Sequence, residues 1–304
     1  MNITPSISVV IPTRNNENDL IDCMHSIINL EFPLENIEII IWDNNSNKNS
    51  KRQIKQFLTN TVENKFIKVE FIENSNNHGV YTSRDKLFKR ISESSQFVLS
   101  IDDDVILPSN ILRALIPLFD QDSGIGIIGP RTVYDDGTLE TAHGAGFINW
   151  WLGRYSDLDA REKLECDYVI GCCMLIRKSV IDEIEGFDPD YYTSHGEVDF
   201  CVKAKQKGYK TTYYPGVIVR HRVERGGTQT LERKYYVFRN KLFIIKKNAP
   251  LPQKWTALSL YFLFWPFKAI LDSFRRNRSI DLQEIKIILK AITDAWLKRS
   301  GRRM

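Results

Sequence analysis

The chain has 304 residues, of which 42% are hydrophobic and 26% charged, a composition typical of a globular protein. This length is sufficient to bury a full core in one large α/β domain or two fused halves. The net charge of +4 is small but unevenly placed, because ten Lys and Arg residues and only four acidic residues follow Phe267.

Cysteine usage, the first residues and hydropathy predict a protein that is neither secreted nor membrane-spanning. The five cysteines are odd in number and lack metal-ligand spacing, which predicts reduced core residues of a cytosolic protein. The opening MNITPSIS is polar and uncharged, so no signal peptide is expected. No run reaches the roughly 18 apolar residues of a spanning helix, so none is predicted.

In the first hundred residues, short β-branched strands alternate with amphipathic helices. This alternation predicts a mostly parallel, doubly wound sheet. The carboxyl ends of its strands would bring Asp43, Asn77–Gly79 and Asp102–Asp104 to one edge. The predicted strands are Ile7–Pro12, Ile37–Trp42, Lys68–Ile72 and one starting at Phe97, and the predicted helices carry Leu20–Ile28, Lys51–Leu58 and Tyr81–Ile91.

The stretch Phe97–Pro108, FVLSIDDDVILP, places three carboxylates at the end of a buried strand. Two unit charges about 4 Å apart repel by roughly 4 kcal/mol at an effective dielectric of 20, so a compensating cation is expected. Helix capping explains them poorly, because the next helix, Ile111–Phe119, has Ser109 or Asn110 as its N-cap. A solvated turn is the alternative.

After Phe119 strands no longer alternate regularly with helices. This α+β pattern predicts an antiparallel extension of the same sheet. No low-complexity linker separates the two halves, so one continuous domain is expected. The expected elements are a strand at Gly124–Pro130, a hairpin at Asp135–Gly137, a long strand at Tyr168–Arg177, a turn at Gly186–Pro189, a helix after His195 that stops at Gly208, and strands at Lys210–Tyr214 and Val217–His221.

The chain beyond Arg222 is basic and aromatic. Thr230–Lys247 has a helical pattern, and Trp255–Ile270 is strongly apolar but interrupted by Pro266 and Lys268. With its basic continuation, this run predicts either an interfacial helix with an electrostatic membrane anchor or a core helix that packs back onto the domain. No nucleic-acid recognition motif accompanies it.

Motifs in a fixed order across residues 6–245 resemble family 2 glycosyltransferases, in particular rhamnosyltransferase-like members. The resemblance implies a GT-A fold, a nucleotide-sugar donor, a divalent metal and inversion at the anomeric carbon. The motifs are VVIPTRN at Val9–Asn15, WDNNS at Trp42–Ser46, Asn77-x-Gly79 with Arg84, IDDDV at Ile101–Val105, GCCMLIRK at Gly171–Lys178, GFD at Gly186–Asp188, EVDFCVKAKQKGY at Glu197–Tyr209, His221, and RKYYVFRN at Arg233–Asn240.

The expected fold class is therefore α/β of the GT-A type: a Rossmann-like, mostly parallel sheet flanked by helices, with a small antiparallel extension and a helical C-terminal segment. Residues 1–225 would form the glycosyltransferase domain, with a nucleotide-sugar-binding half (1–105) and an acceptor-binding half (106–225). Residues 226–304 would form the helical, aromatic and basic segment.

The acids are candidates for a metal site. A nucleoside diphosphate leaving group concentrates negative charge, and hard Asp oxygens suit Mg²⁺ or Mn²⁺. The resemblance makes Asp102 and Asp104 a D-x-D element, with Asp104 on the metal and Asp102 on the ribose or metal-bound water. Asp103 would be a solvated or hydrogen-bonded acid and the one whose mutation matters least. His221 is either a third metal ligand or structural.

The donor nucleotide would meet residues at the ends of the first four strands and in the loops that follow them. Asp43 is placed to accept from base or ribose hydroxyls, or else caps a turn. Arg84 can pair with phosphate, or else is a solvated helix residue. The other expected donor contacts are Pro12, Thr13, Arg14, Asn15, Asn77, Gly79, Asp102 and Asp103.

An inverting transfer needs one general base. The family's base is the aspartate of a Glu-Asp-x-Asp pattern, and this chain departs from it with Gly196-Glu197-Val198-Asp199, which makes Glu197 the candidate base. Asp199 is an acceptor contact or an acid of the first helical turn. Trp150 and Trp151 can bind sugar, pack or face a membrane. Gly171 and Cys172 are expected where the backbone approaches the acceptor closely, or else Cys172 and Cys173 belong to a core strand.

The sequence thus predicts a hexosyltransferase-type enzyme that moves a sugar from a UDP- or dTDP-linked donor to a glycan or lipid-linked saccharide. It would act in the cytoplasm at the inner face of the cell membrane, with peripheral contact through residues 255–304. A sugar-phosphate nucleotidyltransferase is the alternative enzyme, although Thr13–Asn16 lacks that class's glycine-rich loop. A non-catalytic sugar-binding relative is the third possibility.

Overall fold

The computed structural model describes residues 6–62, 64–223, 230–264, 266–268, 271, 274–275 and 282–304. Its strands are β1 (Ile7–Thr13), β2 (Ile37–Asp43), β3 (Lys68–Glu73), β4 (Phe97–Ile101), β5 (Val105–Ile106), β6 (Ile125–Tyr134), β7 (Thr141–His143), β8 (Ala145–Asn149), β9 (Arg154–Leu158), β10 (Leu164–Cys166), β11 (Cys173–Arg177) and β12 (Lys210–His221). Its helices are α1 (Glu17–Ile28), η1 (Leu34–Asn36), α2 (Lys48–Phe57), η2 (Leu58–Val62), α3 (Val80–Phe88), α4 (Ile111–Gln121), α5 (Lys178–Ile184), α6 (Gly196–Gln206), α7 (Leu231–Asn248), α8 (Gln253–Leu263) and α10 (Leu282–Trp296).

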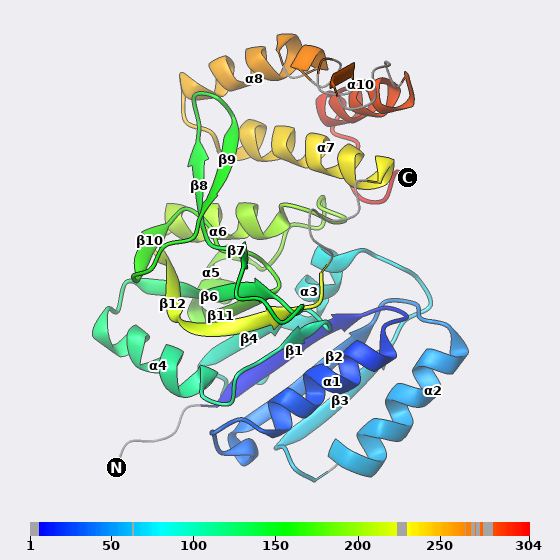
Figure 1. Ribbon diagram of the computed structural model, residues 1–304, viewed down its shortest axis with the longest axis vertical. Coiled ribbons are helices and arrows are strands. Elements are labelled where there is room, and N and C mark those ends of the chain that lie inside the picture. The colour runs from blue at the N-terminus through cyan, green and yellow to red at the C-terminus, as the bar shows by residue number, and fades with distance from the viewer. Residues whose placement is uncertain are drawn as a thin grey trace.

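One large sheet organises the molecule, in the order β10-β12-β6-β11-β4-β1-β2-β3, with β5 beside β12 and β7 beside β6 (Figure 1). The strands β4, β1, β2 and β3 are parallel neighbours, as the alternating pattern predicted. Strand β11 runs antiparallel to both β4 and β6, and β8 and β9 form a separate antiparallel hairpin. The prediction of a mostly parallel sheet with a small antiparallel extension is confirmed.

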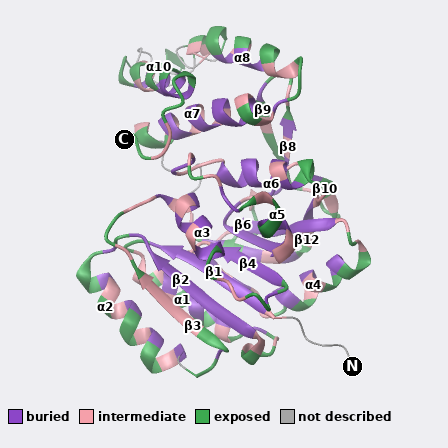
Figure 2. Ribbon diagram, turned by 180° about the vertical axis from the view of Figure 1, so that it is seen from behind, coloured by how far each residue is buried: buried purple, intermediate pink, exposed green. Residues whose placement is uncertain are grey.

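Helices cover both faces of the sheet because its central strands are apolar on both sides (Figure 2). Successive side chains of a strand point to opposite faces. Val9 and Ile11 of β1 therefore pack in one core with α1, α2 and α4, while Val10 packs in a second core with α3, α5 and α6. The loops that follow the parallel strands all emerge at one edge, where the site lies.

Two of the expected strands differ from the structure. The long strand expected at Tyr168–Arg177 is only β11, because the chain first forms a bridge from Tyr168 to Gly146 and joins the main sheet at Cys173. The two strands expected at Lys210–Tyr214 and Val217–His221 form one continuous strand, β12. Its register with β6 shifts between Tyr214 and Ile218. Strands absorb such an irregularity as a bulge, so it does not break the pairing.

The C-terminal segment packs against the domain as a helical layer (Figure 1). Helix α7 covers the predicted helical stretch and lies against α6, α8 and α10. The Tyr235 hydroxyl donates to Asp294 Oδ2 over 2.7 Å, and Lys234 pairs with Glu284 at 2.9 Å, so α10 is fastened to α7. Helix α10, which lies in the basic continuation beyond the Trp255–Ile270 run, therefore packs onto α7.

Helix α8 has two different sides. Ala257, Leu258 and Tyr261 are buried with the main core, whereas Trp255 and Leu263 are exposed. Part of the Trp255–Ile270 run lies outside the described residues. Among the helices that the structure does describe, none combines the length and apolar character needed to cross a bilayer.

Candidate active site

A pocket of about 470 Å³ opens where β1, β2 and β4 end. Ligands of open α/β sheets bind at this edge, beyond the carboxyl ends of the strands. Most of the expected donor contacts line it, together with residues from α3, from the loop before α6 and from α7. The lining residues are Pro12, Thr13, Arg14, Asn15, Asn16, Asn44, Asn77, Gly79, Val80, Asp102, Asp103, Tyr192, Thr193 and Glu232.

Asp102, Asp104 and His221 come together beside this pocket. One ligand atom from each lies within 4.8 Å of the others, and His221 Nε2 is 3.1 Å from Asp104 Oδ1. The pairing of β5 with β12 explains this proximity, because it sets Val105 opposite His221 and so brings the end of β12 to the aspartates. Within the part of the chain that the structure describes, this is the one group of three His, Cys, Asp or Glu side chains close enough together to hold a metal ion.

The charges of this cluster suit a divalent cation. Apart from the contact with His221 Nε2, Asp104 Oδ1 is buried without a hydrogen-bond partner among the described residues, and His221 Nδ1 is buried without one. Burial lowers the pKa of His221, but Cys172 and Asp104 oppose this and raise it to about 11. Carboxylates are the preferred ligands of Mg²⁺ and Mn²⁺, and an imidazole is a usual ligand of transition metals. The cluster can therefore hold a divalent metal.

Arg84 supports the cluster from the adjacent helix α3. Its side chain is almost fully buried, and its Nη2 lies 2.6 Å from Asp102 Oδ1. The alternative of a solvated arginine is excluded by this burial, and Arg84 does not line the pocket. Burial raises the pKa of the Asp102 carboxyl and Arg84 opposes this, so the guanidinium helps to keep Asp102 ionised.

Asp103 points to the other side, toward β1. Its carboxylate accepts hydrogen bonds from Thr13 Oγ1 at 2.6 Å and from Asn16 Nδ2 at 3.1 Å. Burial raises its pKa to about 7, although both hydrogen bonds oppose the shift. Asp103 is thus the hydrogen-bonded acid of the two expected alternatives, and it ties the loop after β1 to the loop after β4.

Glu197 lies in the first turn of α6, where the left-handed conformation of His195 starts the helix. The residue is 6% exposed, and its carboxylate accepts a hydrogen bond from the Tyr81 hydroxyl. Burial raises the pKa of Glu197, while Tyr81 and Arg84 oppose the rise. A raised pKa is typical of carboxylates that act as proton acceptors near neutral pH.

Gly171 makes the approach of these groups possible. A Cβ at Gly171 would lie 2.8 Å from Arg84 Nη1 and 3.3 Å from Glu197 Cβ. Its neighbour Cys172 accepts a backbone hydrogen bond from Asp102 N–H at 2.9 Å, and its thiol is buried. The backbone at this motif therefore lies close to Arg84, Glu197 and Asp102, and Gly171 and Cys172 directly precede β11.

Two expected acids lie in buried polar clusters and do not line the pocket. Asp43 is fully buried, accepts a hydrogen bond from the Ser46 N–H at 3.1 Å and pairs with Lys51 at 3.2 Å. These contacts correspond to the alternative role expected for Asp43, that of capping a turn. Asp199 receives a hydrogen bond from Asn248 at 2.7 Å and pairs with Lys203 at 2.9 Å.

The two tryptophans lie at the tip of the β8–β9 hairpin. Trp150 packs against the main core, and Trp151 is half-exposed. Neither lines the pocket beside Asp102. The hairpin carries this tip to the C-terminal helices, where Gly153 approaches Tyr261 and Ile245 closely. The expected stacking of these tryptophans on an acceptor beside the aspartates is therefore not supported by their position.

Several lining residues escaped the sequence interpretation. Asn44 had a signal, because it stands inside the WDNNS motif; its side chain bonds Asn77 Oδ1 at 2.8 Å and the His78 N–H at 2.9 Å. Tyr192 and Glu232 belong to segments far along the chain, and no local pattern connects them with the donor half. Folding alone brings them to the pocket.

Gly79→Ala is expected to destabilise the protein at this pocket. Gly79 has φ +83°, and a Cβ there would overlap the Tyr192 carbonyl oxygen, which accepts the Val80 N–H at 3.0 Å. Crowding of this kind costs about 1–3 kcal/mol, in addition to the strain of a positive φ. Urea unfolding measures the loss. Gly137→Ala is the matched control, because Gly137 has φ +81° with nothing within 4 Å. Equal losses in both variants would show that contact with Tyr192 is unimportant.

Comparison with known families gives consistent matches. The family model described as Glycosyl transferase family 2 matches residues 8–185, more than half of the chain. A second, described as Glycosyl transferase family group 2, matches residues 97–274. The matched stretches include the pocket, the aspartates, Glu197 and His221.

The chain is similar to several curated proteins. Glycosyltransferase AglE of Haloferax volcanii is 22% identical over 85% of this chain and 80% of its own length. Minor teichoic acid biosynthesis protein GgaA of Bacillus subtilis is 32% identical over 45% of this chain and 29% of its own length. Uncharacterized protein y4gI of Sinorhizobium fredii is 25% identical over 81% of this chain, which spans 28% of that relative's length.

Solved structures share the architecture. S. aureus TarS 1–349 matches with a TM-score of 0.63 at 17% identity, covering 95% of this chain and 80% of TarS 1–349. The mannosyltransferase PcManGT from Pyrobaculum calidifontis, in complex with GDP-Man and Mn²⁺, matches with a TM-score of 0.63 at 13% identity, covering 98% and 89%. These likenesses confirm the predicted GT-A fold.

Proposed function

This chain belongs to glycosyl transferase family 2, and from that membership we propose that it moves a hexose from a nucleoside diphosphate sugar to a hydroxyl of a glycan or lipid-linked saccharide, with inversion at the anomeric carbon. The observation that carries the proposal is the grouping of Asp102, Asp104 and His221 beside a pocket at the ends of the parallel strands. A divalent cation bound by these side chains would act as a Lewis acid on the diphosphate leaving group.

The donor would occupy the pocket of about 470 Å³. Arg14, Asn15 and Asn77 offer side-chain hydrogen-bond donors there, and Arg14 adds an exposed positive charge; Thr13 lines the pocket while its hydroxyl donates to Asp103. UDP- and dTDP-linked sugars are the proposed donors, and the resemblance to rhamnosyltransferase-like members makes rhamnose one sugar to test. The structures of TarS with UDP-GlcNAc and of PcManGT with GDP-Man support a nucleotide sugar as the donor class.

Glu197 is the proposed general base. It would accept the proton of the acceptor hydroxyl as that oxygen attacks the anomeric carbon. Gly171 and Cys172 border it and remain in the proposed acceptor site. Trp150, Trp151 and Asp199 are not retained in it, because the structure places them at the hairpin tip and in a buried cluster. Residues 1–105 and 106–225 are the proposed donor and acceptor halves.

We also propose peripheral contact with the inner face of the cell membrane through residues 255–304. Its support is exposed apolar surface: Trp255 is 63% exposed, Leu263 79% and Phe267 63%. Residues 265, 269–270, 272–273 and 276–281 of this segment lie outside the described part of the chain.

A product assay tests the proposed reaction. The protein is incubated with UDP-, dTDP- and GDP-linked sugars in the presence of Mn²⁺, Mg²⁺ or EDTA, and the released phosphates are identified. We expect a nucleoside diphosphate to be released from at least one donor only when metal is present. In a parallel incubation with nucleoside triphosphates and sugar 1-phosphates, release of pyrophosphate would indicate a nucleotidyltransferase. Donor binding without release, with or without acceptors, would indicate a non-catalytic relative.

A further inference from the structure

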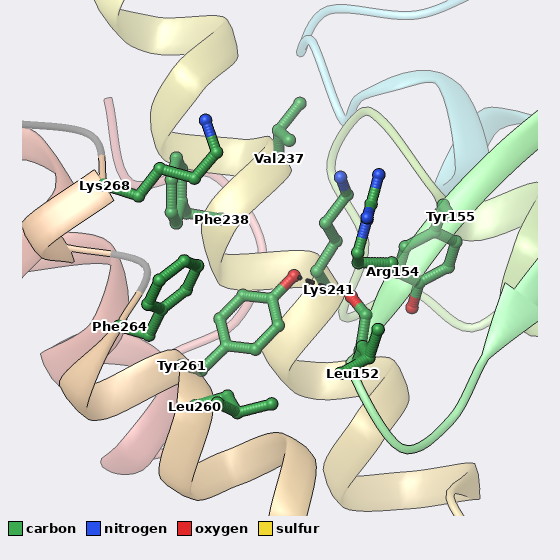
Figure 3. A pocket seen from close by; sticks show the side chains of 11 residues that line it. Leu152, Arg154, Tyr155, Val237, Phe238, Lys241, Leu260, Tyr261, Phe264 and Lys268 are labelled. Atoms are coloured by element: carbon green, nitrogen blue, oxygen red, sulfur yellow. Dashed lines mark hydrogen bonds between the residues drawn. The ribbon is translucent and has the colours of Figure 1, made fainter. Parts of the chain in front are cut away.

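A second cavity of about 650 Å³ lies between α7, α8 and the tip of the β8–β9 hairpin (Figure 3). It shares no lining residue with the pocket beside the aspartates. Ligand pockets typically measure about 300–1,000 Å³, so this volume suits a small or chain-like ligand. No part of the proposed reaction uses it.

The walls of the cavity are amphipathic. Phe238, Leu260 and Phe264 supply apolar surface, while Arg154, Lys241 and Lys268 supply three cations. In Figure 3 the three cationic groups lie toward one side of the cavity, with Leu260 and Phe264 on the other. No acidic side chain is among the described residues that line it. A ligand with an anionic group at one end and a hydrocarbon body matches this arrangement.

Lys241 is the residue of this cavity that most needs an anionic partner. It is partly buried, and the structure gives its amine no hydrogen-bond or ion-pair partner among the described residues; its contact is with the face of the Tyr155 ring, 5.1 Å away. Burial lowers the pKa of Lys241. The carboxylate of Asp157 opposes this shift, but it already accepts a hydrogen bond from the Tyr168 hydroxyl. A cation desolvated in this way is costly unless an anion joins it.

The surface beside the cavity favours a lipid over a free phosphate as the occupant. Phe264 lines the cavity and is 49% exposed, and the adjacent Leu263 and Phe267 are more exposed still. Exposed apolar side chains flanked by Lys254 and Lys268 form the kind of surface that binds an anionic bilayer. A free phosphate would use the cations and leave the apolar wall and the exposed surface unused.

We propose that this cavity binds the phosphate and first carbons of a membrane lipid phosphate with a single long chain, the carrier of the acceptor saccharide. The inference rests on the proposed function and names the class of its acceptor. The position agrees, because the Tyr155 ring meets the His195 ring at 5.4 Å between centroids, and His195 is the residue from which α6 and Glu197 start. The cavity therefore lies next to the start of the helix that carries the proposed base.

Sedimentation with vesicles tests this inference on the full chain. Neutral phosphatidylcholine vesicles are doped with hexadecyl phosphate or, as the uncharged match, hexadecanol, and inorganic phosphate is added as competitor. We expect binding to the phosphate-bearing vesicles, weak binding to the alcohol-bearing ones, and little competition by inorganic phosphate. Lys241→Met should weaken the phosphate-dependent binding about 10–100-fold, because one charge-assisted hydrogen bond is worth about 1.5–3 kcal/mol.

Matched variants separate this site from general attraction to the membrane. Lys241→Arg should restore binding, Arg154→Gln should weaken it in the same direction, and Lys48→Met, an exposed lysine on α2, should leave it unchanged. Lys241→Met should melt no lower than wild type, because it removes an unpaired, partly buried charge.

Three results would overturn the inference: equal binding of wild type and Lys241→Met, equal binding to both kinds of vesicle, or full competition by inorganic phosphate. Metal-dependent release of nucleoside diphosphate by the wild type is measured separately, both with water alone and with glycan acceptors. If release occurs without phosphate-dependent vesicle binding, only the lipid site fails. If vesicle binding occurs without release, the proposed function fails.

Discussion

Asp104→Asn is expected to lower turnover by about 10²–10⁴-fold and to weaken the binding of Mn²⁺ or Mg²⁺. Asp104 is the acid whose Oδ1 lies 3.1 Å from His221 Nε2, and it has no other partner there among the described residues. Lewis-acid stabilisation of a leaving group is worth several kcal/mol, and each 1.36 kcal/mol changes a rate tenfold. Steady-state kinetics over a range of metal concentration, with calorimetric titration of the metal, measures both effects. The amide keeps the size of the side chain, so the fold should be retained.

Asp120→Asn is the control for Asp104→Asn. Asp120 is an exposed aspartate on α4 and belongs to neither pocket. Its substitution removes the same charge and should leave metal affinity and turnover unchanged. If Asp104→Asn binds metal and turns over like wild type, the assignment of the metal site to Asp102, Asp104 and His221 is wrong.

Glu197→Gln is expected to reduce turnover by about 10²–10⁴-fold, the usual worth of a general base, with little change in donor affinity. The amide can still meet the Tyr81 hydroxyl but cannot accept a proton from the acceptor. Because burial raises the pKa of Glu197, the acid limb of the wild-type rate profile should lie above the ordinary glutamate range near pH 4.3. Activity falls as the pH drops through that value, since the protonated carboxyl is no base. The variant should lose this limb.

Asp199→Asn is the matched control for Glu197→Gln, because Asp199 is a buried acid two residues further along the same helix. Its loss should lower stability through the Lys203 and Asn248 contacts while turnover per folded molecule is retained. Glu197→Asp restores the carboxylate of the family pattern and should keep more activity than Glu197→Gln. If turnover of Glu197→Gln equals that of wild type, Glu197 is not the base.

The sequence by itself determined the parallel half of the sheet and the place of the site. Ile7–Thr13 and Ile37–Asp43 are β-branched runs bounded by polar residues, and such patterns depend on near neighbours in the chain. Parallel strands end at a common edge, so the three aspartates after β4 could be placed next to the residues after β1 and β2. The motif order was sufficient to identify the family.

The tertiary structure alone decided which groups meet. The Tyr81 hydroxyl reaches Glu197 across 116 residues of sequence, and Thr13 reaches Asp103 across 90. Arg84 could be read as a phosphate ligand or a solvated residue, and the structure gives it a third role, a buried ion pair with Asp102. The cavity around Lys241 joins a hairpin tip to two later helices. Contacts of this kind arise when distant segments pack on a shared core, and no local pattern of hydrophobicity or charge encodes them.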